Sequence, residues 1–330
     1  MSKLNLTILC AGLAALTSCT GSTGHKSNEK YFLVATNVKV QYWQSATSGL
    51  MKAAKAVDVS AETVGPDTYD AQAEQQAFRT ALAKQPAGIL VSAADPNLLK
   101  ADIDTAVGQG VPVITVDSDS PGSKRIGFIG TNNREAGVMG ARRLVKELNG
   151  KGNVVLYSMP GQLNLEERMR GYKDVLAENP GIKIIQTIDV KGDPRVAFDS
   201  TSDFLDKSKV KPDAFACLEA IACKEVADVL DRKKITGKVI VAMDTDQGTL
   251  DWIKKGAIAA TIAQKPFTMA YYGLKMLADI HLNKPASLDH NWAQDTQSVF
   301  PTFIDTGATL IDKGNVDSFI TDRDADKAGK

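Results

Sequence analysis

The stretch that decides the fold is 88–131, which reads GILVSAADPNLLKADIDTAVGQGVPVITVDSDSPGSKRIGFIGT. Its apolar runs at 88–92, 112–116 and 126–129 are short and contain many Ile and Val residues, which is typical of buried strands. Between the first two runs, 97–109 has the apolar spacing of an amphipathic helix. A strand, a helix and a further strand in this order predict a parallel sheet with helices on its faces.

The same alternation extends from this stretch in both directions. On the N-terminal side, we expect strands at 31–35 and 58–64 and helices at 42–56 and 71–84. After residue 131 the rhythm restarts, with strands predicted at 153–157, 182–188, 214–216, 239–243 and 259–263. The accompanying helices are predicted at 135–148, 165–178, 194–207, 222–232, 247–255 and 266–281. Two successive rounds predict an α/β protein made of two doubly wound parallel-sheet lobes.

Polar and aromatic side chains follow many of the predicted strands. In doubly wound sheets a ligand binds outside the carboxyl ends of the strands, so these side chains are the candidate site. The candidates are Tyr42, Trp43, Ser92, Asp117, Asp119, Thr131, Arg168, Glu219, Asp244 and Gln264. Carboxylates accept hydrogen bonds from hydroxyl groups, Arg and amide groups donate them, and aromatic rings stack on C–H faces. The set therefore predicts a site for a polyhydroxyl ligand.

Each candidate also has a purely structural interpretation. Asp117 and Asp244 are placed where aspartates commonly cap helices. Tyr42 and Trp43 could instead pack the first helix against the sheet, and Arg168 could lie on a solvated helix face. The binding-site interpretation is favoured because all these residues fall on the same edge of the two predicted sheets.

The composition excludes several classes of function. Lys and Arg together number 39, as do Asp and Glu, so no nucleic-acid partner is expected. Only three His are present, without a C-x-x-C or H-E-x-x-H pattern, so neither a metal nor another cofactor is predicted. No G-x-G-x-x-G follows the first strand, and no G-x-S-x-G or Walker loop occurs. We therefore do not expect an enzyme.

The N-terminus has the pattern of a secretory signal. Lys3 precedes an apolar run at 4–16 that is too short to span a membrane. The run ends in Leu-Thr-Ser-Cys, which resembles a bacterial lipobox and implies a signal peptide at 1–18 and a lipidated Cys19. The polar segment that follows predicts a flexible tether at 19–30. We expect the protein in the periplasm or at the cell surface, held to the membrane only by its lipid.

Two further cysteines, Cys217 and Cys223, lie six residues apart in the second round of elements. The expected compartment permits disulfides, but their geometry cannot be read from the sequence. A disulfide and a pair of buried thiols are both left open.

Five motifs are informative in combination: VITVDSD at 113–119, IGTNN at 129–133, ERMRGY at 167–172, AMD at 242–244 and GAIAATIAQ at 256–264. Together they resemble the type I periplasmic sugar-binding proteins, the ribose-binding-protein-like solute receptors of ABC importers. The resemblance covers 31–320. It implies that Tyr42 and Trp43 stack on a sugar and that Asp117 holds its hydroxyl groups from the N-terminal lobe. Further contacts are implied for Arg168, Asp244 and the hinge glutamine Gln264.

The sequence departs from the ribose-type pattern at Ser92, Ser118 and Leu218, where that pattern has Asn, Arg and Asn. Three hydrogen-bonding groups are lost or shortened, which argues against ribose itself. Glu219 and Asp119 are the expected replacements.

The resemblance also implies how the chain is divided. We expect an N-terminal lobe of 31–131 plus 265–296 and a C-terminal lobe of 132–264 plus 297–330. The three-segment hinge is expected near 131–132, near 264–265 and within 293–299. A monomer that closes on a small sugar or polyol and delivers it to an ABC permease is implied. The alternative is a sensory receptor that presents its ligand to a membrane histidine kinase or chemoreceptor.

Overall fold

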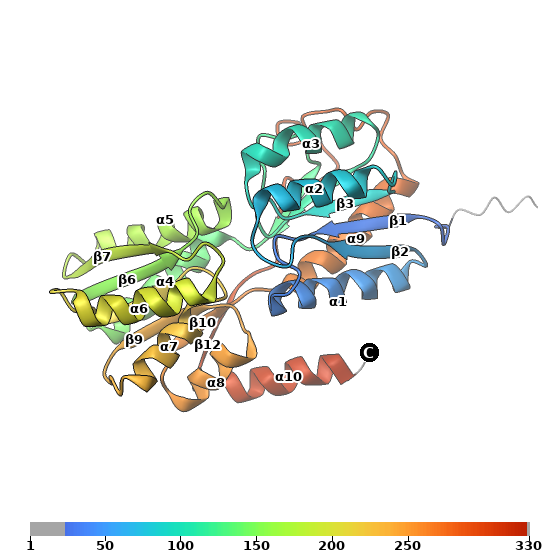
Figure 1. The fold of residues 1–330 in the computed structure, drawn as a ribbon. Coiled ribbons are helices and arrows are strands. Elements are labelled where there is room, and N and C mark those ends of the chain that lie inside the picture. Colours follow the sequence, from blue (N-terminus) through green and yellow to red (C-terminus); the bar gives the residue numbers. More distant parts are fainter. Residues whose placement is uncertain (1–23, 329–330) are drawn as a thin grey trace, which may run out of the picture.

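The computed structural model describes residues 24–328, and Figure 1 shows two α/β lobes that lie side by side. The predicted signal peptide and Cys19 lie outside the described residues. Each lobe contains a six-stranded sheet. Among residues 24–328, none of the helices combines the length and the apolar character that a membrane crossing requires.

The first lobe is built mainly from the N-terminal part of the chain. Its elements are β1 (Lys30–Val34), α1 (Gln41–Ala56), β2 (Ser60–Val64), α2 (Ala71–Leu82), β3 (Gly88–Val91), α3 (Pro96–Gly108), β4 (Val113–Val116), β5 (Gly127–Gly130), α9 (Pro266–Leu282) and β11 (Phe303–Asp305). The strands are all parallel, in the order β11-β5-β4-β3-β1-β2. Helix α1 packs beside α9, and α2 beside α3. The long helix α9 therefore returns to the first lobe after the chain has built most of the second.

The second lobe repeats this plan. Its elements are α4 (Asn133–Glu147), β6 (Gly152–Ser158), α5 (Leu163–Ala177), β7 (Ile182–Asp189), α6 (Pro194–Lys207), β8 (Ala214–Cys217), α7 (Ala222–Arg232), β9 (Val239–Met243), α8 (Gln247–Lys255), β10 (Ala260–Ala263), β12 (Thr309–Asp312) and α10 (Val316–Ala328). The strand order is β12-β10-β9-β8-β6-β7, and β12 alone runs antiparallel to its neighbour. The predicted α/β fold of two doubly wound lobes is confirmed.

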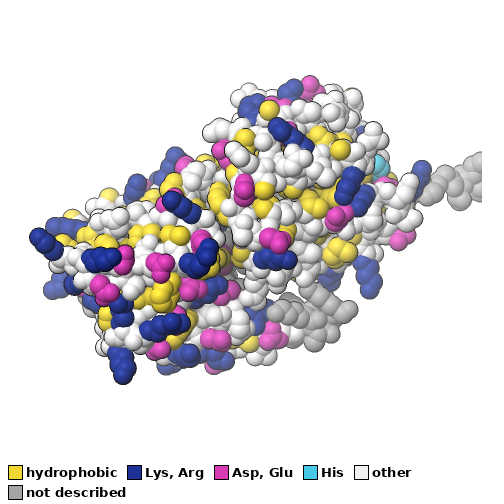
Figure 2. Space-filling view, viewed as in Figure 1, with side chains coloured by type: hydrophobic (Ala, Val, Ile, Leu, Met, Phe, Trp, Pro, Cys, Tyr) yellow, Lys and Arg dark blue, Asp and Glu magenta, His cyan; other side chains and the backbone are white. Residues whose placement is uncertain are grey.

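The central strands lie in the hydrophobic core of each lobe. Strands β3, β4, β8 and β10 are buried along their whole length. Strands covered by helices on both faces are expected to be continuously apolar, as these sequences are. On the outer face shown in Figure 2, Lys and Arg are interspersed with Asp and Glu over both lobes, in keeping with the balanced charge.

Two glycines allow α4 and α5 to approach closely. A Cβ atom at Gly137 would lie 2.2 Å from the backbone oxygen of Arg168, and one at Gly171 would lie 2.2 Å from that of Arg134. Only glycine fits contacts this short, because its α-carbon carries no side chain. The close packing fixes the part of α5 that carries Arg168.

Three segments connect the lobes. Two of them, at Thr131–Asn132 and at Gln264–Lys265, lie where the sequence predicts crossings. The third was expected at 293–299, and that position is wrong, because β11 pairs with β5 in the first sheet. The chain crosses between β11 and β12, so the first lobe extends to Asp305 and the second resumes after it.

The three connecting segments are hydrogen-bonded to one another. Thr306 donates its backbone N–H to the carbonyl of Gly130 at 2.8 Å, and Asn132 donates its own to Asp305 Oδ1 at 3.0 Å. Thr131 Oγ1 donates to Gln264 Oε1 at 2.9 Å. The hinge is thus a compact group of strands and turns that meets the cavity at Gln264.

The end of the predicted tether is ordered against the first lobe. The Glu29 side chain, 8% exposed, accepts a hydrogen bond from the backbone of Lys26 at 2.7 Å. The backbone oxygen of Glu29 accepts from the backbone N–H of Ser60 at 3.0 Å. A flexible tether that reaches residue 30 is therefore wrong for this last part, because its polar groups bond to the lobe.

Candidate functional site

A cavity lies between the lobes at the carboxyl ends of their strands. The residues that line it come from both lobes: Thr36, Asn37, Val40, Tyr42, Trp43, Tyr69, Asp117, Met159, Gln162, Asn164, Leu165, Arg168, Gly192, Glu219, Ala220, Ile221, Asp244 and Gln264. Seven of the ten predicted binding residues are in this set: Tyr42, Trp43, Asp117, Arg168, Glu219, Asp244 and Gln264.

Asp117 and Asp244 occupy equivalent positions in the two lobes. Both have a left-handed backbone, with φ of 64° and 68°. Each donates its backbone N–H to the next strand, Asp117 to Ile129 at 3.1 Å and Asp244 to Ile262 at 2.9 Å. Aspartate tolerates this conformation better than most residues. The helix-cap interpretation is wrong for both, because Asp246 caps α8 and a strand is the next element after Asp117.

The Asp117 carboxylate is surrounded by donors from α1, from α5 and from the residue that follows β3. It accepts from Tyr42 Oη at 2.6 Å, from Ser92 Oγ at 3.2 Å and from Asn164 Nδ2 at 3.2 Å. Asn164 belongs to α5, so this last bond joins the two lobes. Burial raises the pKa of Asp117, and the positive charge of Arg168 opposes that rise.

Arg168 is 2% exposed and connects α5 to three other segments. Its Nε donates to Asn133 Oδ1 at 2.9 Å, and its Nη1 donates to the backbone oxygen of Leu218 at 2.7 Å. Its Nη2 donates to Gln264 Oε1 at 2.8 Å. The interpretation of Arg168 as part of a solvated helix face is therefore wrong.

Gln264 links the hinge to the second aspartate. Its amide oxygen accepts from Thr131 and Arg168, and its Nε2 donates to Asp244 Oδ1 at 2.9 Å. Burial raises the pKa of Asp244 to about 7, against the opposing effect of Arg168. The conformation of the hinge and the position of Asp244 are thus joined through one side chain.

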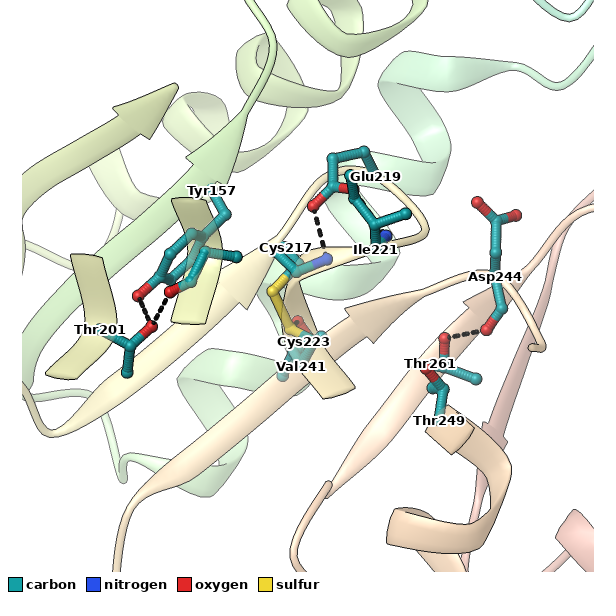
Figure 3. The surroundings of a disulfide bond; sticks show 12 residues. Tyr157, Thr201, Cys217, Glu219, Ile221, Cys223, Val241, Asp244, Thr249 and Thr261 are labelled. Atoms are coloured by element: carbon teal, nitrogen blue, oxygen red, sulfur yellow. Dashed lines mark hydrogen bonds between the residues drawn. A yellow bond between two sulfur atoms is a disulfide. The ribbon is translucent and has the colours of Figure 1, made fainter. Parts of the chain in front are cut away.

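Glu219 lies in a loop that a disulfide closes (Figure 3). Cys217 and Cys223 are bonded, with their Cα atoms 5.7 Å apart, which settles the alternatives left open above. The Glu219 carboxylate accepts from the backbone N–H groups of Ile221 at 2.6 Å and Ala222 at 3.1 Å. Burial raises the pKa of Glu219 to about 7.

Three aromatic side chains line the first-lobe side of the cavity. Trp43 is 5% exposed, and its Nε1 donates to Thr36 Oγ1 at 3.0 Å. Tyr42 meets it edge to face, with ring centroids 5.2 Å apart. Trp43 thus packs the first helix as well as bordering the cavity. Tyr69, from the segment before α2, was not predicted.

Three predicted binding residues do not line the cavity. Ser92 and Thr131 lie behind the lining. Ser92 hydrogen-bonds Asp117 and Thr131 hydrogen-bonds Gln264, and these two partners line the cavity. Asp119 is directed elsewhere: it accepts from Thr115 Oγ1 at 2.6 Å and from Arg125 Nη2 at 2.6 Å, and it also bonds Arg125 Nε. Asp119 therefore forms a buried ion pair, and its expected role as a replacement contact for the ligand is wrong.

Several lining residues were missed by the sequence reasoning. Thr36 and Asn37 directly follow β1, so the strand-end argument alone would have included them. Asn164 lies four residues before Arg168 on α5, and helical spacing places such residues on the same face. Tyr69 has no comparable signal, because its place depends on how the lobes meet. Within residues 24–328, no group of His, Cys, Asp or Glu is arranged to hold a metal ion.

Comparison with known proteins identifies the family to which this chain belongs. Residues 31–285 match the periplasmic binding protein domain, so the chain belongs to this family. It is 24% identical over 270 residues to the D-allose-binding periplasmic protein of Escherichia coli strain K12, covering 78% of this chain and 86% of that protein. The resemblance to type I periplasmic sugar-binding proteins is confirmed, and the chain is a solute-binding protein rather than an enzyme.

Solved structures agree with this assignment. A sugar-binding protein of a sugar ABC transporter from Bacillus halodurans has a TM-score of 0.75 and 33% identity, covering 88% of this chain and 99% of that one. The solved structure of a XylFII-LytSN complex has a TM-score of 0.77 and 26% identity, covering 87% of this chain and 98% of that one. The same fold is thus found in an ABC transporter component and in a complex with a second protein.

Proposed function

We propose that this protein captures a small sugar or polyol between its lobes outside the cytoplasmic membrane and delivers it to an ABC permease. One observation carries the proposal. The cavity brings together two aspartates in equivalent positions of the two lobes, an arginine, the hinge glutamine and aromatic rings from the first lobe. Acceptors, donors and flat apolar faces are the groups that bind a polyhydroxyl molecule.

The geometry supports a mechanism in which the ligand holds the lobes closed. Asn164 bonds Asp117 across the cavity, and the backbone N–H of Gln247 bonds Gln41 Oε1 across its rim at 3.0 Å. Each lobe alone offers half of the polar groups, so a ligand that contacts both halves stabilises the closed form. Periplasmic binding proteins as a class close around ligands by hinge bending.

A thermal-shift screen of the protein against pentoses, hexoses, polyols and amino sugars tests the proposal. A ligand at about 100 times its Kd adds about 2.7 kcal/mol of stability, which is a readily measured shift. Asp117→Ala is expected to weaken the bound sugar about tenfold or more, since each charge-assisted hydrogen bond contributes about 1.5–3 kcal/mol. If no compound of these classes shifts the melting temperature, the proposed function is wrong.

We also propose that the protein is a lipoprotein anchored through Cys19, after removal of 1–18. The support is the lipobox-like Leu-Thr-Ser-Cys sequence at the end of the apolar run. Labelled palmitate should enter the wild-type protein in cells and should be absent from Cys19→Ala. Labelling of the variant would contradict the proposal.

Sensing is a second candidate function, favoured by the likeness to the XylFII-LytSN complex. In this alternative the closed lobes present their ligand to a membrane receptor instead of a permease. Cross-linking in cells followed by purification of the tagged protein distinguishes the two, because the captured partner is either a permease or a receptor.

We propose, finally, that the protein is a monomer. Light scattering after size exclusion tests this proposal.

A further inference from the structure

The cavity contains more negative than positive charge. Asp117, Glu219 and Asp244 line it, and Arg168 is the one cationic side chain among its described lining residues. The three acids are 7%, 4% and 7% exposed. Buried charges that lack partners are costly, so an excess of two carboxylates is a feature that the ligand has to complement.

Arg168 does not pair directly with any of these acids. Its three hydrogen bonds go to Asn133, the backbone of Leu218 and Gln264, all of which are neutral acceptors. The next cation near Glu219 is Lys224, whose Nζ lies 3.4 Å from Asp246 Oδ1. The protein itself therefore supplies no direct counter-ion for the ionised forms of Asp244 and Glu219, whose pKa values burial raises to about 7.

The unmet hydrogen-bonding capacity lies on the second-lobe side. Asp117 accepts three bonds and Glu219 accepts two, whereas Asp244 accepts one, from Gln264 to Oδ1. Among residues 24–328, no hydrogen-bond donor reaches Asp244 Oδ2. Figure 3 shows the Asp244 carboxylate pointing away from the end of its strand, and the Glu219 carboxylate turned toward Ile221 in its own loop. The site thus lacks a charged donor beside these two groups.

We infer that the ligand is a sugar or polyol of monosaccharide size that carries a protonated primary amine, with its ammonium group directed at Asp244 and Glu219. This inference rests on the proposed function and names the class of its ligand. An ammonium group has three donors and no acceptor, and its bonds to carboxylates are about twice as strong as neutral ones. A neutral sugar supplies donors but brings no positive charge to stabilise the ionised forms of Asp244 and Glu219.

Isothermal titration calorimetry with matched pairs tests the inference. The pairs are D-glucosamine with D-glucose, D-galactosamine with D-galactose, and D-mannosamine with D-mannose, with N-acetyl-D-glucosamine as an uncharged amide control. In at least one pair, the amine is expected to bind about tenfold or more tightly than its neutral partner, and the amide is expected to lose this advantage. Equal or tighter binding of the neutral sugar in every pair that binds would overturn the inference while leaving the proposed function in place. If no compound of either kind binds, the inference is overturned, and the wider thermal-shift screen against pentoses, hexoses, polyols and amino sugars decides whether the proposed function fails as well.

Two variants separate the charge from other effects. Asp244→Asn and Glu219→Gln should each reduce the preference for the amine, whereas Glu225→Gln, which removes a carboxylate of α7 outside the cavity, should not. Asp244 faces Arg168, Asp117 and Asp246, and Glu219 faces Lys224 and Asp244. Because burial raises both pKa values to about 7, amine affinity should fall on acidification from about pH 7 to about pH 5.5. A preference that is unchanged in both cavity variants would overturn the assignment of the ammonium to this side.

Discussion

Replacing Gly192 with Ala is expected to hold the lobes apart. Gly192 lies between β7 and α6 of the second lobe, and Tyr69 of the first lobe lies directly against it. A Cβ atom at 192 would lie 2.3 Å from Tyr69 Cβ and 3.0 Å from Tyr69 Cγ. Rotation of the tyrosine does not move its Cβ, so the clash is relieved only if one lobe shifts away from the other.

The expected loss of affinity follows from the cost of an overpacked contact. Forcing one extra methyl group into a packed contact costs about 1–3 kcal/mol. The cost falls on the closed form, and the apparent affinity depends on the population of that form. Ligand Kd should therefore rise about 5- to 150-fold. The positive φ of 71° at Gly192 adds backbone strain of about 1–2 kcal/mol in open and closed forms alike, which lowers stability but not affinity.

Gly237→Ala is the matched control. Gly237 has a φ of 75°, but a Cβ there would meet no atom within 4 Å, so only the backbone strain is reproduced. Calorimetry with the tightest-binding compound of the thermal-shift screen measures affinity, and solution scattering measures closure. The reasoning is refuted if Gly192→Ala binds as tightly as wild type, or if both variants lose affinity equally.

Three further outcomes are expected. Cys217→Ala combined with Cys223→Ala should lower the free energy of unfolding by about 2 kcal/mol, because the bridge closes a loop between residues six apart. The same change should weaken ligand binding, because the bridge closes the loop that carries Glu219. An unchanged melting temperature and affinity would show that the bridge is not needed. Asp119→Asn should destabilise the protein by about 3–5 kcal/mol, because Arg125 loses its buried partner, while the Kd of the folded fraction stays at the wild-type value; a loss of affinity without a loss of stability would restore Asp119 to the site. The third outcome concerns pH: the folded protein keeps the protons of Asp244 and Glu219 to about pH 7, whereas their ordinary pKa values are 3.8 and 4.5. Ligand-free stability should therefore fall as pH rises through this window, by up to about 1.4 kcal/mol per pH unit for each carboxyl, and Asp244→Asn with Glu219→Gln should flatten that slope in urea denaturation at several pH values.

The fold was largely predictable because its signals are local. Apolar runs such as 88–92 and 112–116 and the amphipathic helices between them each identify an element without reference to the rest of the chain. The elements that were not predicted, β11, β12 and α10, come after 282 and lack this signal. Strands of three and four residues carry little periodicity, and their place depends on the strands with which they pair.

The edge of the sheets that carries the site was also predictable, because parallel strands present their carboxyl ends together. That argument brought Asp117, Asp244, Arg168 and Gln264 to one cavity. It did not distinguish Asp117 from Asp119, two residues further along, because both follow the same strand. Their different roles come from Arg125, whose guanidinium pairs with one and not the other.

The sequence by itself determined two doubly wound lobes, the order of their strands and helices through 281, and the edge on which ligand groups gather. These properties follow from patterns that repeat over a few residues. Only the tertiary structure decided that Asn164 reaches Asp117 from the other lobe, that Tyr69 meets Gly192, and that the chain crosses for the third time after Asp305. Each of these depends on contact between residues far apart in the chain, and the packing of the two lobes brings those residues together.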